Sequence, residues 1–163
     1  MRQDLYKALA PSIPNAIKER RTDDETRRRR MQANRRALGR TLASLTKTTP
    51  SDRAIQRCCD ALVDYVSFSH YGVFWRINNG EERRQEARRV GDAVYPRLQS
   101  STEQILRFTQ HYQGREVGNS TTRFGRDLAR LGKHLKARFT LEDQLLKAMM
   151  STKTEPARPS KVA

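Results

Sequence analysis

The chain has 163 residues, of which 31% are charged and 36% hydrophobic, and its 33 Lys and Arg against 18 Asp and Glu give a net charge of +15. This length suits one folded domain rather than two cores, and the composition favours amphipathic helices over a thick buried sheet. No apolar run approaches the ~20 residues of a membrane span, and the N-terminus lacks the apolar stretch of a secretory signal. We therefore expect a cytoplasmic protein without membrane contact.

The N-terminal segment, residues 1–21, is expected to be a basic arm, because two prolines exclude an uninterrupted helix. The sequence Thr22-Asp-Asp-Glu25 then matches a capping box, which predicts that the first helix begins here and ends before Pro50. Its first two turns are almost wholly charged, so we expect them to face solvent or a polyanion such as DNA. The arginines expected to bind nucleic acid are Arg27, Arg28, Arg29, Arg30, Arg35 and Arg36.

Three further helices are expected over residues 52–78, 81–113 and 120–150. Ser51 is a suitable cap for the first of them, and Asn78-Asn79-Gly80 is a strong stop signal. Pro96 predicts a kink or a restart in the next, because proline lacks the amide hydrogen. The last helix places apolar residues on one face at steps of three and four. These residues are Phe124, Leu128, Leu131, Leu135, Phe139, Leu146 and Met149.

Four long helices joined by short turns predict an all-α fold, an antiparallel four-helix bundle with a basic N-terminal arm and a disordered C-terminal tail. The bundle is expected over residues 22–150. Residues 151–163 show no periodic pattern and are assigned to the tail.

The second helix has more apolar surface than one core needs. At 100° per residue, one face is a complete apolar stripe made of Ile55, Cys59, Leu62, Val66, Val73 and Ile77. The opposite face carries Arg57, Asp60, Asp64, Ser67, Phe68, Tyr71 and Trp75. Contiguous exposed aromatic surface typically serves recognition, so this face is interpreted as a partner-binding surface. The alternative is that the first helix or the arm covers it.

Two charged residues of the fourth helix, Arg138 and Glu142, fall on or beside its apolar stripe and are four residues apart. We expect them to form a structural salt bridge. The alternative is a polar cavity lined by Glu142 and His70.

The sequence lacks the common motifs of catalysis, including G-x-S-x-G, a Gly-rich phosphate loop and H-E-x-x-H. Its three histidines are scattered, without the Glu-x-x-His spacing of metal-binding bundles. Cys58 and Cys59 lie in an apolar helical pattern and are interpreted as reduced core thiols. A binding protein is therefore expected, with no enzyme activity, catalytic residue, metal, cofactor or small-molecule substrate.

Three separated segments resemble the Rsd/AlgQ family: CDALVDYVSFSHY (residues 59–71), YPRL (95–98) and LKARFTLED (135–143). The resemblance covers about residues 52–149 and implies a helical bundle. Members of that family bind region 4 of the housekeeping sigma factor, the helix-turn-helix that reads the promoter −35 element. An anti-sigma or sigma-remodelling activity is therefore implied, with sigma and RNA polymerase as partners.

The resemblance also implies roles for single residues. Asp64 matches the aspartate of the family's L-V-D-Y motif, which meets basic residues of sigma, and His70 and Tyr71 match its G-H-F segment. The partner-binding set is thus Asp60, Asp64, Ser67, Phe68, His70, Tyr71 and Trp75. The strongly basic charge departs from the family, and we expect the basic arm to touch DNA or another part of the polymerase. The alternative function is a nucleic-acid-binding transcription cofactor on a helical-bundle scaffold, without sigma sequestration.

Overall fold

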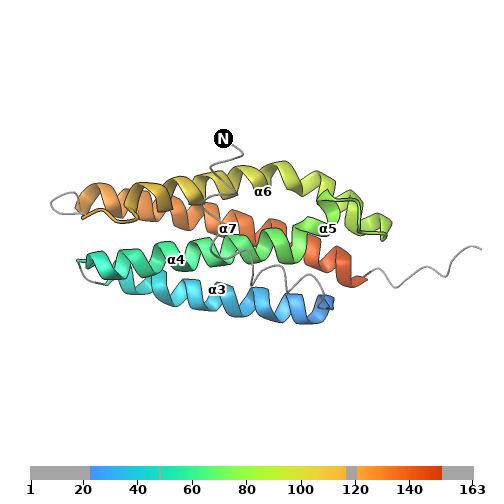
Figure 1. Ribbon diagram of the computed structural model, residues 1–163, viewed down its shortest axis with the longest axis horizontal. Helices are drawn as coiled ribbons and strands as arrows, with labels where there is room; N and C mark the ends of the chain where they lie inside the picture. Colours follow the sequence, from blue (N-terminus) through green and yellow to red (C-terminus); the bar gives the residue numbers. More distant parts are fainter. Residues whose placement is uncertain (1–22, 48, 117–120, 152–163) are drawn as a thin grey trace, which may run out of the picture.

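The computed structural model describes residues 23–47, 49–116 and 121–151, which are mostly helical and contain no strand. Figure 1 shows the elements in chain order. They are α3 (Asp24–Thr46), α4 (Asp52–Phe68), the π-helix η3 (Ser69–Phe74), α5 (Trp75–Asn78), α6 (Gln85–Tyr112) and α7 (Thr121–Ser151).

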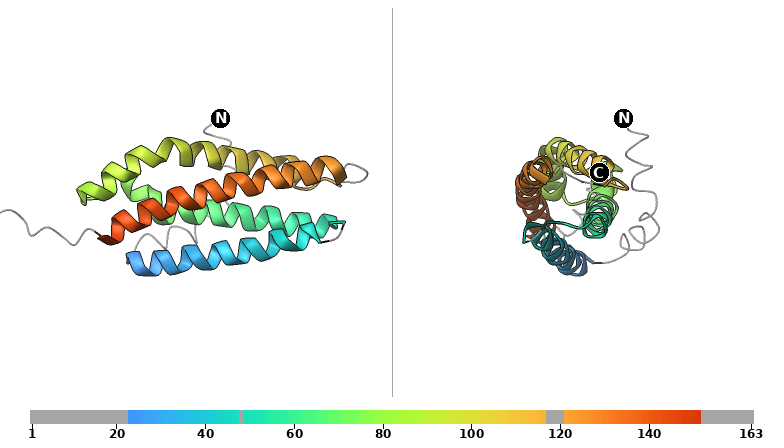
Figure 2. Two further views of the ribbon diagram at one scale, coloured as in Figure 1. Left: turned by 180° about the vertical axis from the view of Figure 1, so that it is seen from behind. Right: turned by 90° about the vertical axis from the view of Figure 1, so that its left-hand side faces the viewer.

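The four long helices form an antiparallel bundle, as predicted. Successive long helices run in opposite directions, and Figure 2 shows them arranged as a ring when viewed end-on. Helix α4 packs between α3 and α6, while α7 packs against α6 and α3. Each long helix therefore has two neighbours, and the space between the four is the core.

Side-chain caps mark the beginnings of the first two long helices. The Asp23 carboxylate accepts a hydrogen bond from the Thr26 amide at 2.7 Å. The cap of α3 is therefore Asp23, and the expected cap, Thr22, lies outside the described residues. The Ser51 hydroxyl accepts from the Ala54 amide at 3.2 Å, which confirms the predicted cap of α4.

The second predicted helix ends where expected, but its last third is not a regular α-helix. The chain passes through η3 before the short α5 finishes at Asn78. Gly80 follows with a φ of 69°, a left-handed conformation that favours glycine and ends the helix.

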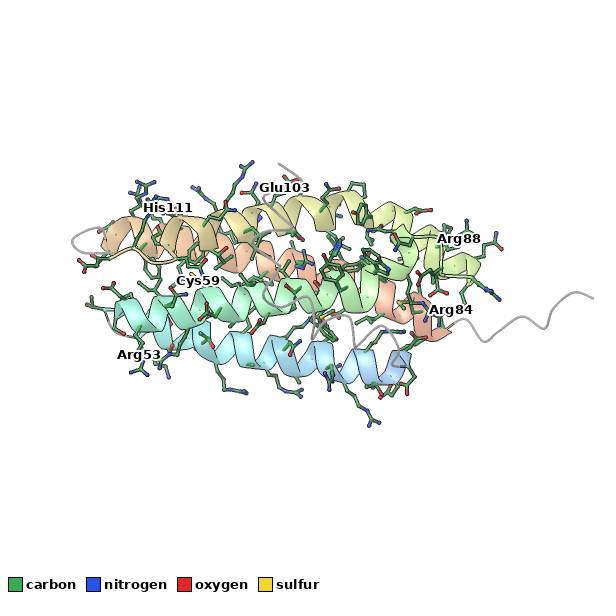
Figure 3. All side chains as sticks on the ribbon, in the orientation of Figure 1. Arg53, Cys59, Arg84, Arg88, Glu103 and His111 are labelled. Carbon is green, nitrogen blue, oxygen red and sulfur yellow. The ribbon has the colours of Figure 1, made fainter. Side chains whose placement is uncertain are left out.

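The third helix begins at Gln85 rather than Glu81, because residues 82–84 form a junction instead. The buried Glu82 carboxylate accepts hydrogen bonds from Arg84 Nε at 2.8 Å and Nη2 at 2.7 Å. Arg84 Nη1 also donates to Asp24 and to the carbonyl of Met149. Figure 3 shows Arg84 at the end of the bundle where α5 leads into α6. This junction ties the start of α3 to the end of α7.

Pro96 predicts a kink or a restart, but helix α6 continues through it from Gln85 to Tyr112, so there is no restart. Proline removes one hydrogen-bond donor, and the surrounding turns keep their helical geometry.

A single apolar core fills the bundle. All six residues of the predicted inner stripe of the second helix are buried, and so is the predicted stripe of α7 except for the half-buried Phe139. Within the described residues, no helix is both long and apolar enough to cross a bilayer. The predicted arm, residues 1–21, lies outside the described residues, as does the predicted tail except for Ser151, which belongs to α7.

Candidate functional site

The second half of α4 presents two carboxylates at the protein surface. Asp60 and Asp64 are four residues apart, about one helical turn, and both side chains are exposed. Asp60 accepts a hydrogen bond from Gln56 Nε2 at 2.9 Å. Arg57 is exposed on the same helix. This part of the predicted partner-binding surface is open to solvent.

The neighbouring positions of that predicted face are buried, and the expectation that they are exposed is wrong. Ser67, Phe68 and Tyr71 have exposed fractions of 0%, 6% and 5%. Helix α4 packs against α3 as well as α6, and η3 also contacts α3, so the buried arc is wider than one stripe. The packing favours the alternative in which the first helix covers part of this side.

The aromatic members of the predicted set gather where α4 gives way to η3 and α5. The ring centroid of Tyr71 lies 4.8 Å from that of His70 and 5.6 Å from that of Trp75, and the His70 and Trp75 centroids are 6.5 Å apart. His70 and Trp75 are half-buried. The structure thus divides the predicted set into exposed carboxylates on α4 and a more enclosed aromatic cluster beside them.

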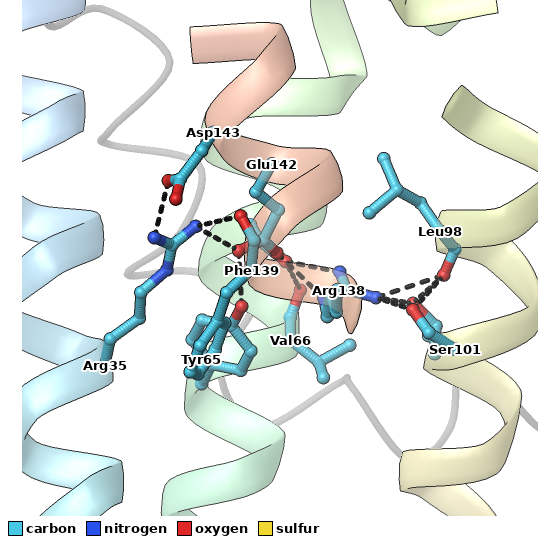
Figure 4. Close-up of polar contacts among 11 residues, drawn as sticks. Arg35, Tyr65, Val66, Leu98, Ser101, Arg138, Phe139, Glu142 and Asp143 are labelled. Atoms are coloured by element: carbon cyan, nitrogen blue, oxygen red, sulfur yellow. Dashed lines mark hydrogen bonds and ion pairs between the residues drawn. The ribbon is translucent and has the colours of Figure 1, made fainter. Parts of the chain in front are cut away.

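The predicted pair on α7 lies at the centre of a buried polar network (Figure 4). Arg138 and Glu142 have exposed fractions of 1% and 0%, and Arg138 Nε donates to Glu142 Oε1 at 2.8 Å. The expected salt bridge is therefore present. The other guanidinium hydrogen bonds go to the Leu98 carbonyl at 3.1 Å, Ser101 Oγ at 2.8 Å, Thr102 Oγ1 at 2.6 Å and Ser69 Oγ at 2.6 Å.

The second oxygen of Glu142 joins the pair to α3 and α4. It accepts from Arg35 Nη2 at 2.9 Å and from the Tyr65 hydroxyl. Burial, followed by the charge of Glu142, raises the pKa of Tyr65 well above its ordinary value. The phenol therefore stays protonated and serves as a donor to the carboxylate.

Sequence reasoning missed most members of this network. A signal was present, because polar residues on three helices interrupt apolar faces at the level of Arg138. These residues are Tyr65 on α4, Ser69 on η3, and Ser101 and Thr102 on α6.

A cavity lies near this pair, although its lining differs from the alternative of a polar cavity lined by Glu142 and His70. His70 and Arg138 both line it, whereas Glu142 is not among its lining residues. Burial lowers the pKa of His70, and the nearby charge of Arg138 lowers it further. His70 is therefore neutral at neutral pH.

The arginines predicted to bind nucleic acid have different environments. Arg35 donates to Glu142 and, through Nη1, to Asp143 at 2.6 Å, and its guanidinium lies 4.6 Å from the centre of the Phe139 ring. Arg27 is 1% exposed and pairs with Asp24 at 2.6 Å. The expectation that these two arginines face solvent or a polyanion is therefore wrong.

The other four remain at or near the surface. Arg28 and Arg29 each pair with Glu25 at 2.9 Å, and Arg29, Arg30 and Arg36 are exposed. A run of consecutive arginines covers every side of a helix, so at least one must face the neighbouring helices. This geometry explains why Arg27 is buried.

No group of three or more His, Cys, Asp or Glu in the described ranges is arranged to hold a metal ion. Cys58 and Cys59 are buried free thiols, as the sequence predicted. Burial raises their pKa values, to about 12 for Cys58 and about 11 for Cys59. Both are therefore protonated at neutral pH and unsuited to nucleophilic chemistry.

Comparison with known proteins supports the resemblance. The model of a family described as regulator of RNA polymerase sigma(70) subunit, Rsd/AlgQ, matches residues 16–150. This range contains every described helix except the final residue of α7.

Three relatives, each called Regulator of sigma D, illustrate the similarity. The protein of Yersinia enterocolitica is 36% identical over 103 residues, which are 61% of this chain and 62% of the relative. That of Yersinia pseudotuberculosis is 33% identical over 103 residues, 61% of each chain. That of an Enterobacter species is 27% identical over 114 residues, 69% of this chain and 68% of the relative. The chain thus matches less than two thirds of the first two relatives, and no solved structure matches it significantly.

Proposed function

This chain belongs to the Rsd/AlgQ family, described as regulators of the RNA polymerase sigma(70) subunit, and on that premise we propose that it is a transcription regulator that binds region 4 of the housekeeping sigma factor. It acts by binding rather than by catalysis, and it does so in the cytoplasm, where the polymerase works. The exposed surface of α4 around Asp60 and Asp64 makes the contact.

The observation that carries this proposal is the pair of exposed carboxylates on a chain with a net charge of +15. A helix-turn-helix contacts phosphates through basic side chains, and carboxylates accept paired hydrogen bonds from arginine. Asp60 and Asp64 can therefore engage the residues with which region 4 holds DNA. Binding of this kind prevents region 4 from contacting the promoter.

The net positive charge of the chain does not prevent this contact. Charges farther apart than a Debye length of about 8 Å are largely screened at physiological salt. Repulsion slows the first encounter, whereas the local carboxylates determine the stability of the docked complex.

Titration of the purified chain against isolated regions of the housekeeping sigma factor tests the proposal. We expect region 4 to bind with a Kd of about 1 µM or tighter, roughly −8 kcal/mol, and region 2 to bind at least tenfold more weakly. Equal binding to both regions, or no binding to region 4 at about 100 µM, would exclude the proposal.

A second candidate function, binding to a nucleic acid, is favoured by the surface of α7. Arg123, Arg126, Arg130 and Lys133 are all exposed, and their spacing of three and four residues places them on one helical face. The acid nearest in sequence, Asp127, lies 3.9 Å from Arg123 and offsets only part of this charge. This face, defined by those four residues, is a better phosphate-binding surface than the first turns of α3.

Salt dependence of DNA binding distinguishes the two basic surfaces. The slope of the logarithm of the DNA-binding constant against the logarithm of salt concentration becomes shallower by about 0.9 for each phosphate that is no longer neutralised. Changing Arg126, Arg130 and Lys133 to Gln is therefore expected to reduce the steepness of that slope by up to ~2.7. The matched control changes Arg29, Arg30 and Arg36 to Gln and is expected to alter the slope less. A larger effect in the control would assign DNA binding to α3, and no effect in either variant would remove this candidate.

A further inference from the structure

The cavity beside the aromatic cluster has the size and lining of a small-molecule site. Its volume is about 340 Å³, at the lower end of the roughly 300–1,000 Å³ typical of ligand pockets. It lies between η3 and α5 on one side and α6 on the other, and one lining residue, Arg138, comes from α7. Lining residues from these elements include His70, Phe74, Trp75, Tyr95, Gln99 and Arg138.

Flat aromatic side chains form much of the wall. Phe74 and Trp75 come from the η3–α5 segment, and Tyr95 comes from α6. Trp75 and Tyr95 are half-buried, and both line the cavity. Rings of this kind favour a planar guest, because offset stacking and edge contacts add about 0.5–1.5 kcal/mol to the burial of the ring.

The only formally charged side chain among the lining residues is Arg138. Its Nη2 nitrogen has two hydrogens, and within the described structure it makes one hydrogen bond, to Ser69 Oγ at 2.6 Å. Arg138 thus places a positive charge at the cavity wall. No Asp or Glu lines the cavity, so nothing there repels an anion.

The surrounding network has more buried positive than negative charge. Arg138 and Arg35 both bind Glu142, which is the single fully buried carboxylate of the network. Asp143, the other acid on Arg35, has a side chain that is 62% exposed and is screened by water. An anionic group next to Arg138 offsets this buried positive charge at low dielectric.

His70 completes the polar side of the cavity without adding a charge. Because its pKa is lowered by burial and by Arg138, the imidazole is neutral and offers one donor and one acceptor. His70 and Phe74 both belong to η3. π-helical turns are rare and are frequent at functional sites, and this one supplies part of the cavity wall.

We propose that this cavity binds a small molecule that combines a flat ring with a carboxylate, with the ring against Trp75 and Tyr95 and the carboxylate facing Arg138. The aromatic wall selects the ring, and the buried guanidinium selects the charge. The site is a binding site for a ligand and requires neither sigma nor DNA.

The fluorescence of Trp75 reports directly on the cavity, because it is the only tryptophan in the chain. Titration of the purified full chain uses two acids, benzoate and phenylacetate, each matched with its neutral amide, benzamide and phenylacetamide. We expect at least one acid to give a saturable change in emission. That acid should bind about tenfold or more tightly than its own amide. Because sigma is absent, failure here leaves the proposed function untouched, and failure of sigma binding leaves this site untouched.

A cavity-filling variant identifies where the probe binds. Gln99→Phe places a ring inside the cavity and is expected to weaken acid binding at least about tenfold. Gln110→Phe is the matched control, since Gln110 is an exposed residue of the same helix outside the lining, and it is expected to bind as the unchanged chain does.

Three results would overturn the proposal. In the first, neither acid gives a saturable change in emission. In the second, an acid and its amide bind with equal affinity. In the third, a Gln99→Phe protein that is folded by circular dichroism binds the acid as tightly as the unchanged chain does.

Discussion

Glu142 is the residue on which the interior of the bundle most depends. Three donors from three helices converge on its carboxylate: Arg138 Nε, Arg35 Nη2 and the Tyr65 hydroxyl. A buried ion pair is expensive to desolvate and contributes little net stability, but removing one partner leaves the other charge buried alone. The network therefore fixes the register of α3, α4 and α7 more than it raises stability.

We expect Glu142→Gln to lower the free energy of unfolding by about 3–5 kcal/mol, because it leaves two arginines without their buried counter-ion. Asp143→Asn is the matched control. It removes the exposed carboxylate that meets the same Arg35, and such surface pairs contribute about 0–1 kcal/mol. Urea denaturation of both variants measures the difference, and similar losses would show that the network is not what positions these helices.

The junction residue Glu82 predicts a particular response to acid. Hydrogen bonds from Arg84 outweigh burial and lower the pKa of Glu82 from 4.5 to about 2. A carboxyl with a depressed folded-state pKa contributes stability above its unfolded value, and that stability is lost as the pH falls from about 4.5 toward 2.

Glu82→Gln should therefore reduce stability at neutral pH by on the order of 1–3 kcal/mol and flatten the loss of stability between pH 4.5 and 2. Glu86→Gln serves as the control, because Glu86 is the acid of a more exposed pair with Arg89. Thermal melts across this pH range provide the measurement. If the stability of Glu82→Gln changed with pH in parallel with that of the unchanged chain, Glu82 would not be the group whose lowered pKa causes the loss of stability in acid.

Residue roles could be predicted from sequence only where the signal is local. The Arg138 and Glu142 pair was predictable, because two charged residues one turn apart on an apolar stripe must meet each other. The partnership of Glu142 with Arg35 joins residues 107 apart and leaves no periodic trace. The Glu82 and Arg84 pair is local, but only its burial between α3 and α7 gives it structural importance.

At the scale of elements, helical-wheel reasoning first fails at Ser67 and Phe68, which are buried because α4 packs against both α3 and α6, and the segment η3 that follows adds a second cause. A π-helix has more residues in each turn than an α-helix, so a wheel drawn at 100° per residue drifts out of phase after Phe68. Val73 and Ile77 are buried as predicted, but Tyr71 and Phe74 are buried with them. Helix order and boundaries were predictable to within a few residues because caps and stop signals are local, whereas the local winding was not.

The close approach of α5 to α6 provides a test at this scale. A Cβ at Gly91 would lie 2.7 Å from Cγ2 and 2.8 Å from Cδ1 of Ile77. We expect Gly91→Ala to destabilise the protein by ~1–3 kcal/mol, the usual effect of overpacking.

Gly132→Ala on α7 is the matched control for this substitution. Nothing lies within 4 Å of the added methyl group, and alanine favours a helix over glycine by about 1 kcal/mol, so this variant is expected to be more stable. Chemical denaturation compares the two. A stabilising Gly91→Ala would mean that Ile77 moves aside freely and that α5 is loosely packed.

At the scale of the whole molecule, the structure separates exposed acidic residues on α4 from exposed basic residues on α7. The chain carries 33 basic and 18 acidic residues, yet α4 exposes Asp60 and Asp64 while α7 exposes four cations on one face. Figure 3 shows side chains projecting along the whole length of the bundle. Sequence analysis placed the charge that contacts nucleic acid on the basic arm and the first helix, because only the folded structure shows which arginines pair internally.

The affinity of Asp64→Ala for sigma region 4 tests the central claim most directly. Asp92→Ala, which removes an exposed carboxylate from α6, is the matched control, and circular dichroism confirms that both variants are folded. We predict that Asp64→Ala weakens binding about tenfold or more, or ~1.4 kcal/mol, while Asp92→Ala binds like the unchanged chain. Equal affinity of all three proteins for region 4 would contradict the assignment of α4 as the sigma-binding surface.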